Sequence, residues 1–485
     1  PCRKRSRRFN YGIVINFLIV RKVSILAGET SDFKRPSKKK TQSKNNENIY
    51  QMDRDLNKNL SNNIIDLALE PTIKLLRSTG FPRKFIDAII FSSCAPDQYL
   101  SSIIAEILGV KPKISHRLDN LCNSGTNAII SAFSYISSGL CDSALVIGAE
   151  LADSPGRVLL TDFSRGQFSL PLYWGAIFKK IHMKQYGTKE EQICMIPVNN
   201  YSKAKYNDKA LNQHKNISLI DVMNSKMLVE PLRLLECCSI CEGASSILLV
   251  ANEKIPFFTS ELFSDVDHYD KECTSFDANL SYNYNKIGDN NNVGKKELIP
   301  VSIKGIGQQT SCASFSNGFE ENFRCSPAKI AAQSAYDMAD IQANDIDVVE
   351  LHDAFSILEI MAYEDLGFVS KGQGGKFVER QESNIFVNPR GGIIGCGHVL
   401  GATGIAQTVE IFKQLSKQVD DDIGVKYHNK IEMNDFVPRN SSKFDALNVT
   451  KQYKTNRQIK SELKFGLIHN LAAAGTSASI LILEK

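Results

Sequence analysis

The feature that most constrains this chain of 485 residues is an order of helices and strands that occurs twice. A helical pattern at 63–78 leads through a short polar turn to a strand-like run at 86–90, and the helical pattern at 328–339 leads in the same way to 346–350. Helices that alternate with buried strands predict an α/β fold with helices on the faces of a sheet. We therefore expect two similar βαβαβ halves, packed in layers about a pseudo-twofold axis.

Each half also contains a small glycine-bearing turn that runs into an apolar helical pattern. Residues 120–128 put Cys122 at the start of one helix, and residues 395–404 put His398 at the start of another. The two turns occupy equivalent positions in the repeat, so this packing is expected to bring Cys122 and His398 into one pocket. Unpaired N–H groups at a helix start are expected to lower the pKa of the Cys122 thiol. A nearby imidazole then completes a Cys–His nucleophile.

Each of these residues, taken alone, also fits an ordinary structural role. A buried cysteine is most often a small apolar side chain, and a buried histidine is most often a hydrogen-bonded part of the core. Cys238 and Cys241 form a single CxxC with no second pair nearby, so the sequence favours two core side chains over a metal site. The glycines of 395–404 have GxGxxxG spacing, which disfavours dinucleotide binding.

Two further polar clusters follow predicted strands. His352 and Asp353 come directly after the strand at 346–350, at the end where α/β sheets bind ligands, although Asp353 also suits a helix cap. His469 ends the strand predicted at 465–469. The small-residue turn around Ala472 can offer backbone N–H groups to an oxyanion, or it can be a tight turn in the core. The sequence therefore predicts a site assembled from four separate parts of the chain.

Composition limits the classes of function. The formal net charge of +5 comes largely from the first forty residues, so no nucleic-acid partner is expected. The 12 cysteines are scattered, which disfavours a disulfide framework, and no apolar run reaches the ~20 residues that span a membrane. Residues 1–22 hold seven basic side chains and no acidic one, which predicts a mitochondrial presequence. A peroxisomal or cytoplasmic location is the alternative.

The same patterns predict how the chain is divided into segments. We expect a basic extension at 1–22, a first half at 23–256 with a loop domain inserted at about 150–242, a polar insertion at 257–299, and a second half at 300–485 with an insertion at about 417–460.

Taken together, these motifs resemble the thiolase family, in particular its sterol-carrier-protein thiolase branch. Residues 120–125 are similar to the family's nucleophile motif, 352–355 to its HDCF motif, and 388–404 to its GHP motif. Residues 182–188 resemble the segment of the covering loop that touches the acyl-pantetheine end of the substrate. The resemblance covers residues 21–485 apart from the insertions. It implies a duplicated thiolase fold, with the loop domain over the site.

The resemblance also implies a role for each matched residue. Cys122 is the acylated nucleophile, His398 activates it, and His352 helps to hold the thioester oxygen. Four further residues are implied in or behind the oxyanion holes: Asp353, Asn388, His469 and Ala472. His182 and Met183 are implied to contact the substrate. Coenzyme A enters as a substrate, no cofactor or metal is held permanently, and a homodimer or tetramer is expected.

One departure from the family pattern bears on activity. Thiolases use a second cysteine to move the α-carbon proton, but position 354 is alanine and residues 469–474 contain no cysteine. The sequence leaves His352, His469 and Cys396 as possible replacements. A thiolase-like protein that binds acyl-CoA with weak or no thiolysis is therefore the alternative function. A ketoacyl-synthase type of condensing enzyme fits the 352–355 and 469–470 clusters less well.

Overall fold

The computed structural model describes residues 21–35, 64–152, 170–261, 298–311, 326–380, 385–417, 463–473 and 475–485. Nearly all of the predicted extension at 1–22, most of the insertion at 257–299 and all but the first residue of the insertion at 417–460 lie outside these residues. Among the described residues, no helix has the length and apolar character needed to cross a membrane.

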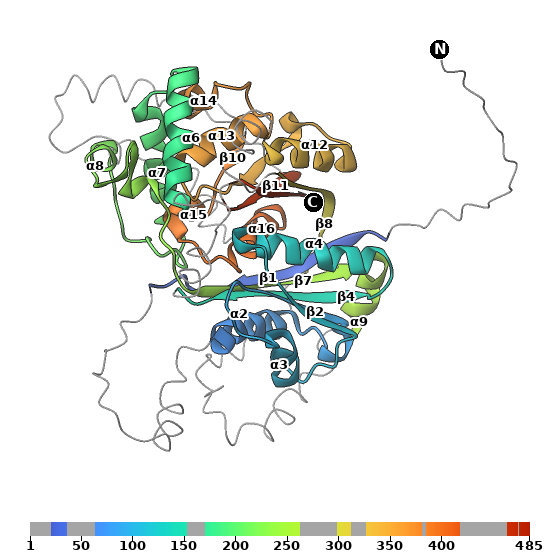
Figure 1. Ribbon diagram of the computed structural model, residues 1–485. Helices are drawn as coiled ribbons and strands as arrows, with labels where there is room; N and C mark the ends of the chain where they lie inside the picture. The colour runs from blue at the N-terminus through green and yellow to red at the C-terminus, as the bar shows by residue number, and fades with distance from the viewer. Residues whose placement is uncertain are drawn as a thin grey trace, which may run out of the picture.

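The centre of the fold is a 10-stranded sheet with the order β10-β9-β11-β12-β8-β1-β7-β4-β2-β3 (Figure 1). Its strands are β1 (Val23–Thr30), β2 (Ala88–Ser92), β3 (Ile114–Leu118), β4 (Ser143–Glu150), β7 (Gly243–Ala251), β8 (Val301–Thr310), β9 (Val348–Glu350), β10 (Phe386–Val387), β11 (Phe465–Ala472) and β12 (Ser477–Glu484). A separate hairpin pairs β5 (Met227–Val229) with β6 (Leu232–Arg233).

The two halves of the sheet repeat one strand order. From the outer edge inward, β3-β2-β4-β7-β1 in the first half corresponds to β10-β9-β11-β12-β8 in the second. In each half the three outer strands are parallel, and the two inner strands are antiparallel to their neighbours. A short antiparallel contact between β1 and β8 joins the halves. The repeat that the sequence predicts is thus present in the strand order.

Helices lie on both faces of each half of the sheet. They are α2 (Ile64–Thr79), α3 (Leu100–Ile107), α4 (Ser124–Ser137), α6 (Pro171–Tyr186), α7 (Glu190–Ala204), α8 (Leu219–Met223), α9 (Ile255–Glu261), α12 (Pro327–Ala339), α13 (Ser356–Asp365), α14 (Gly374–Arg380), α15 (Gly392–Cys396) and α16 (Thr403–Leu415). Helix α9 begins at Ile255, so the predicted polar insertion at 257–299 opens as a helix whose Phe258 packs on Phe81.

Alternate residues of each strand enter different cores, because successive side chains of a strand point to opposite faces. In β2, Ala88 and Ile90 join the central core with α4 and α16, whereas Ile89 and Phe91 join the core under α2 and α3. A third core packs α12 and α13 on the other face of the second half. Helices α4 and α16 therefore lie between the two halves of the sheet (Figure 1).

The first turns of α4 and α16 approach each other closely, and glycine makes this possible. A Cβ atom at Gly404 would lie 2.3 Å from Thr126 Oγ1, and one at Gly125 would lie 3.0 Å from the carbonyl oxygen of Gly401. Contacts this short leave no room for a side chain. The two glycine-bearing turns predicted from the sequence thus meet at the centre of the molecule.

We expect Gly404→Ala to lower the free energy of unfolding by about 1–3 kcal/mol, because overpacking forces neighbouring groups to shift. Urea unfolding followed by circular dichroism measures this change. The control is Gln414→Ala, which alters a half-buried residue near the end of the same helix and is expected to change stability by no more than about 0.5 kcal/mol. Equal stability of the two variants would contradict the close packing.

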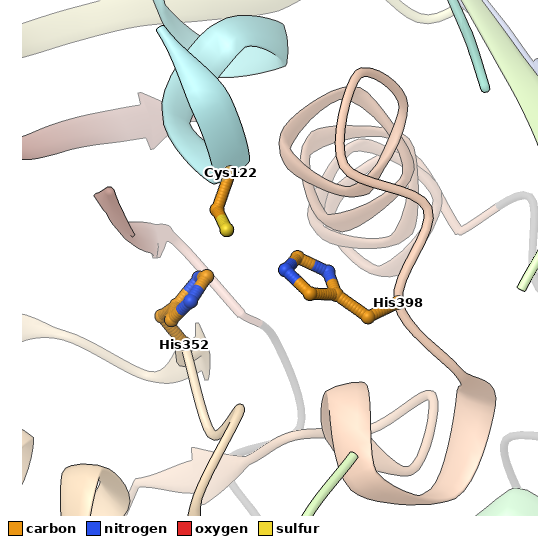
Figure 2. A group of neighbouring side chains, drawn as sticks. All are labelled: Cys122, His352 and His398. Atoms are coloured by element: carbon orange, nitrogen blue, oxygen red, sulfur yellow. The ribbon is translucent and has the colours of Figure 1, made fainter. Parts of the chain in front are cut away.

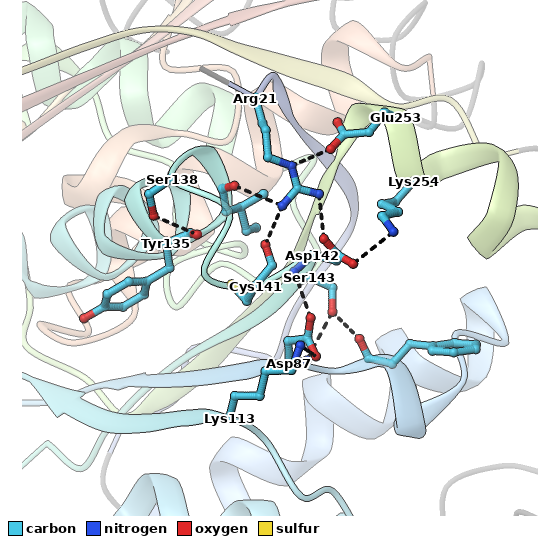
Figure 3. Close-up of polar contacts among 12 residues, drawn as sticks. Arg21, Asp87, Lys113, Tyr135, Ser138, Cys141, Asp142, Ser143, Glu253 and Lys254 are labelled. Atoms are coloured by element: carbon cyan, nitrogen blue, oxygen red, sulfur yellow. Dashed lines mark hydrogen bonds and ion pairs between the residues drawn. The ribbon is translucent and has the colours of Figure 1, made fainter. Parts of the chain in front are cut away.

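Arg21 belongs to the folded body, although the sequence predicts it within the basic extension. Its guanidinium donates hydrogen bonds to Asp142 Oδ1 at 2.6 Å, to Glu253, and to the carbonyl oxygen of Cys141 at 3.1 Å (Figure 3). Lys254 also pairs with Asp142 at 3.3 Å. The last two residues of the predicted extension, Arg21 and Lys22, are therefore bonded within the fold.

Candidate active site

Cys122, His352 and His398 converge on one point, although they come from three distant parts of the chain. One ligand atom from each residue lies within 4.8 Å of the corresponding atoms of the other two. The rings of His352 and His398 are nearly perpendicular, with centroids 5.4 Å apart. Figure 2 shows the Cys122 thiol directed into the space between the two imidazoles. The predicted meeting of Cys122 and His398 in one pocket is confirmed.

Cys122 lies in a single 3₁₀ turn, Leu121–Asn123, that leads directly into α4. The turn is fixed by its neighbours: Ser124 Oγ donates to the carbonyl oxygen of Leu121 at 2.6 Å, and Asn123 Nδ2 donates to Ser479 Oγ of β12 at 2.9 Å. Leu121 has a φ of 49°, a left-handed conformation that is uncommon for a residue other than glycine. The second half of the chain therefore helps to hold the nucleophile of the first.

The sequence predicts that His398 starts a helix. In the structure it lies five residues before the first residue of α16. Its backbone pairs with a neighbouring segment: its N–H donates to the carbonyl oxygen of Ser239 at 2.8 Å, and its carbonyl oxygen accepts from the N–H of Cys241 at 3.1 Å. The pairing fixes the backbone that carries the imidazole. The predicted helix start is wrong because Gly397, with a φ of 94°, and the turn that follows separate α15 from α16.

Thr403 determines which nitrogen of His398 carries the proton. Its hydroxyl donates to the carbonyl oxygen of Val399 at 2.9 Å, so the same oxygen must accept at its contact with His398 Nδ1 at 3.0 Å. Nδ1 is then the protonated nitrogen. Nε2 keeps its lone pair, is buried, and has no hydrogen-bond partner among the described residues. His398 is therefore set up as a proton acceptor on the side that faces Cys122 (Figure 2).

The electrostatics of the pair differ from the sequence-based prediction. Burial raises the pKa of Cys122 to about 12, against the opposing effect of backbone N–H groups of Cys122 and Ala473. The prediction of a lowered thiol pKa is wrong for this state, because loss of hydration outweighs the few N–H groups of one turn. Burial and the nearby His352 also hold the pKa of His398 well below its usual value. The resting pair is a neutral thiol beside a neutral imidazole.

Asp353 and Asn388 hold the segments that carry the two histidines. Asp353 accepts hydrogen bonds from the N–H groups of Ile393 at 2.5 Å and Ile394 at 3.2 Å, so it caps α15 just before His398. Asn388 Oδ1 accepts from the N–H of Leu351 at 2.7 Å, next to His352. Both side chains are buried and lie behind the site.

His469 lies beside His352 and offers a donor. The backbone N–H of His352 points at His469 Nδ1 at 3.4 Å, which makes Nδ1 the acceptor and leaves the proton on Nε2. This buried Nε2 has no hydrogen-bond partner among the described residues. The backbone N–H that reaches the Cys122 thiol belongs to Ala473, one residue after the predicted Ala472. Ala472 instead lies in β11 opposite Ser477, and its carbonyl oxygen closes the turn to β12.

We expect His469→Asn to weaken the acid sensitivity of the fold. Burial lowers the pKa of His469 to about 3, so below pH 6.5 the unfolded chain binds a proton that the folded chain does not. This group does not lower the free energy of unfolding above pH 6.5. Between pH 6.5 and pH 3 it lowers the free energy of unfolding by up to about 1.4 kcal/mol per pH unit. Urea unfolding at pH 7, 6 and 5 should show a shallower pH slope for the variant. Identical slopes would contradict the buried neutral state.

The sequence predicts that His182 and Met183 contact the substrate, but in the structure both side chains make contacts within the protein. His182 is buried in α6, and both of its ring nitrogens are used: Nδ1 with Thr188 Oγ1 at 2.9 Å and Nε2 with Glu364 Oε1 at 3.1 Å. The side chain therefore ties α6 to α13 rather than presenting a free nitrogen to a ligand. Met183 is half-buried and packs on the core formed by α12 and α13.

Two residues that contact the site were not predicted from the sequence. Thr403 and Ala473 carry no signal of their own, because a threonine in a helix and an alanine in a turn are common. Cys396, which the sequence offers as a replacement thiol, donates to the carbonyl oxygen of Arg390 at 2.8 Å and accepts from Asn207. Its thiol is thus occupied behind the His398 segment.

Comparisons with known proteins place this chain in a family. Residues 308–428 match the family model of the thiolase C-terminal domain-like family. An acetyl-CoA acetyltransferase of Methanothermobacter thermautotrophicus is 31% identical over 72% of this chain and 85% of its own length. Bovine sterol carrier protein 2 is 30% identical over 71% of this chain and 61% of its own length. Human mitochondrial 3-ketoacyl-CoA thiolase in complex with CoA shares the fold, with a TM-score of 0.60 at 12% identity over 96% of this chain and 98% of its own. The chain belongs to the thiolase family.

Proposed function

We propose that this protein transfers acyl groups between 3-ketoacyl-CoA and CoA through an acyl group on Cys122. Thiolase-type acyl transfer follows from its family, whose relatives include acetyl-CoA acetyltransferases. The observation that supports the proposal most directly is the convergence of Cys122, His352 and His398 within 4.8 Å. A thiol, an unprotonated imidazole nitrogen and backbone N–H groups are the parts that acyl transfer needs.

In the proposed reaction, the Cys122 sulfur attacks the keto carbonyl carbon while its proton passes to His398 Nε2. Both groups are neutral at rest, so the proton moves as the C–S bond forms and no buried charge has to exist beforehand. The N–H groups of Cys122 and Ala473, which already reach the sulfur, are close to the position of the developing oxyanion. The C–C bond then breaks, and the acetyl-CoA enolate leaves.

The enolate oxygen needs its own donors as this bond breaks. His469 Nε2–H is an unpartnered donor beside His352, and we assign the thioester oxygen to these two histidines. The incoming CoA thiol then attacks the acyl group on Cys122, and the departing Cys122 sulfur takes back its proton from His398. Asp353, Asn388 and Thr403 act by positioning the histidines.

A small, partly open hollow lies next to His469, with Phe178, Leu358, Met361 and Leu471 among the residues that line it. The relatives of this chain include acetyl-CoA acetyltransferases and sterol carrier protein 2. We therefore propose a role in the metabolism of fatty acyl or other lipid-derived CoA thioesters.

The test combines a thiolysis assay with mass spectrometry. The protein is mixed with acetoacetyl-CoA and longer 3-ketoacyl-CoA esters, with and without CoA, and acetyl-CoA is measured as the product. Intact mass spectrometry followed by peptide mapping detects the acyl group on Cys122. CoA-dependent turnover through acylated Cys122 supports the proposal, and an unmodified Cys122 with every substrate overturns it.

Position 354 and residues 469–475 contain no cysteine. This absence favours a second candidate, a thiolase-like protein that binds acyl-CoA with little turnover. The same experiment separates the two functions. Acylated Cys122 without CoA-dependent product release supports binding without thiolysis. Rapid product release supports the enzyme.

We also propose assembly as a homodimer or tetramer. Strand β3 is an edge of the described sheet, and an edge strand presents unpaired backbone groups that a second copy can use. Light scattering coupled to size-exclusion chromatography measures the mass of the assembly. A monomer at micromolar concentration would contradict this proposal.

A mitochondrial location is proposed from the basic, acid-free composition of residues 1–22, with a peroxisome or the cytoplasm as alternatives. Because Arg21 is bonded within the fold, a removable segment would end before it. A fluorescent protein fused behind residues 1–20 tests the proposal. Import into mitochondria supports it, and diffuse fluorescence contradicts it.

A further inference from the structure

We propose that the thiol of Cys238 is the group that exchanges a proton with the α-carbon of the substrate in this site. The inference rests on the proposed function and identifies one further catalytic residue for it. The family resemblance predicts this acid and base at position 354, which is alanine here. The structure supplies a cysteine on the segment that pairs with Ala354.

Residues 237–241 run between the two histidine-bearing segments and pair with both. On one side, Cys237 forms an antiparallel bridge with Phe355, and the N–H of Cys238 donates to the carbonyl oxygen of Ala354 at 2.9 Å. Cys238 is therefore directly opposite Ala354. Directly opposite residues of an antiparallel pair carry their side chains on the same face, with Cβ atoms ~5 Å apart. The thiol of Cys238 thus lies beside the methyl group of Ala354.

On its other side, the same segment pairs with His398. Ile240 forms a parallel bridge with His398, whose N–H and carbonyl oxygen bond to Ser239 and Cys241. Residues that pair in a bridge share a face, and residues two apart in an extended segment also share it. Cys238 and Ile240 are two apart. The side chains of Cys238, Ala354 and His398 therefore lie on one face of this three-segment ribbon.

The electrostatics agree with this placement. Burial, together with Cys237, Cys122 and Asp353, raises the pKa of Cys238 well above its usual value. At neutral pH Cys238 carries its proton, which is the form that can protonate an enolate.

Other candidate thiols are engaged elsewhere. Cys396 is hydrogen-bonded to Arg390 and Asn207, as described above. Cys94 contacts Ser124 Oγ at 3.8 Å, at the base of α4, and its backbone N–H bonds to Glu150. Neither residue lies on a segment that pairs with Ala354 or His398. Cys238 lies on residues 237–241, which pair with both.

The proposed step conserves atoms and charge. During thiolysis, the C–C bond breaks to give the enolate of acetyl-CoA, and the Cys238 S–H proton moves to its α-carbon, giving acetyl-CoA and a Cys238 thiolate. The thiolate then takes the proton of the incoming CoA thiol, and the CoA thiolate attacks the acyl group on Cys122. In the condensing direction, the Cys238 thiolate removes the α-proton of acetyl-CoA.

Two partial reactions test the proposal separately from the proposed function. Transfer of an acetyl group from acetyl-CoA to Cys122 involves no α-proton, so Cys238→Ala is expected to keep it. Exchange of the acetyl-CoA methyl hydrogens with D₂O requires the α-proton step, and cleavage of acetoacetyl-CoA does too. Both are expected to fall about 10²–10⁴-fold, the usual effect of losing a positioned acid or base. Mass spectrometry measures all three reactions.

Matched variants distinguish chemistry from folding. Cys237→Ser changes the adjacent thiol, which donates to the carbonyl oxygen of Arg233 instead, and is expected to leave methyl exchange unchanged. Ala354→Cys in the Cys238→Ala background returns a thiol to the opposite strand and is expected to restore exchange. Wild-type rates of exchange and cleavage in Cys238→Ala would overturn the proposal while leaving Cys122 acylation intact. The absence of methyl exchange in an acylated wild-type protein would overturn it as well, whereas failure to acylate Cys122 would overturn the proposed function itself.

Discussion

Cys122→Ala is expected to abolish acyl transfer, with kcat for thiolysis reduced about 10⁶-fold, as when the nucleophile of a covalent mechanism is removed. Among the described residues, the side chains that converge with Cys122 within 4.8 Å are His352 and His398, so Cys122 is the sulfur placed beside the base. Acetoacetyl-CoA consumption in the presence of CoA measures the rate, and intact mass spectrometry measures the acyl-enzyme.

Cys141→Ala is the matched control for this experiment. Cys141 is also a free thiol, but it is buried in the central core beside β4. Its variant is expected to be acylated and to turn over at nearly the wild-type rate. Turnover by Cys122→Ala within tenfold of the wild type would refute covalent catalysis through this residue.

His398→Gln is expected to lower kcat/KM about 10²–10⁴-fold, because the acceptor for the thiol proton is lost. The pKa of His398 is held well below 6.5, and the base must be neutral. The acid limb of the pH–rate profile is therefore expected well below pH 6.5, with a flat region through neutral pH. An acid limb centred near pH 6.5 would contradict the buried neutral imidazole.

Two threonines of α16 provide a finer test of the same step. Thr403→Val removes the partner of His398 Nδ1, so the proton is no longer fixed on that nitrogen, and about a tenfold loss in kcat/KM is expected from one hydrogen bond. Thr408 is likewise buried and donates to the carbonyl oxygen four residues earlier. Thr408→Val, which does not touch His398, is expected to preserve kcat/KM. Equal effects of the two variants would remove the argument that Thr403 selects the tautomer.

The strands that the sequence predicts are those buried on both faces. Apolar runs identify β2 and β11, and the same turn precedes β2 and β9. Residues Arg83–Phe85 and Ala343–Asp345 each form a 3₁₀ turn before the strand. The edge strands β3 and β10 are not predicted. Strand β3 reads Ile-Ser-His-Arg-Leu and is half-exposed, and β10 has only two residues, so neither shows an apolar pattern.

The sequence predicts a site residue where a side chain that can act as a nucleophile or base lies in a turn that contains glycine. Cys122 and His398 satisfy both conditions, and the repeat relates their positions. The tautomer of His398 depends on Thr403, and the N–H at the sulfur comes from Ala473, so both follow from hydrogen-bond geometry that spacing alone does not encode. The thiol pKa was predicted in the wrong direction because burial depends on what the second half packs over Cys122.

The position of α4 and α16 between the two halves of the sheet has a consequence for biosynthesis. The half that contains Cys122 is synthesised first, and the part of the α4 surface that packs on α16 has no cover until α16 and β11 are translated. A nascent chain at that stage holds a reactive sulfur without its base and an exposed apolar surface. Competence for catalysis therefore arises only when the last-made segments dock, so truncation near the carboxyl end silences the enzyme even though its nucleophile has already been made.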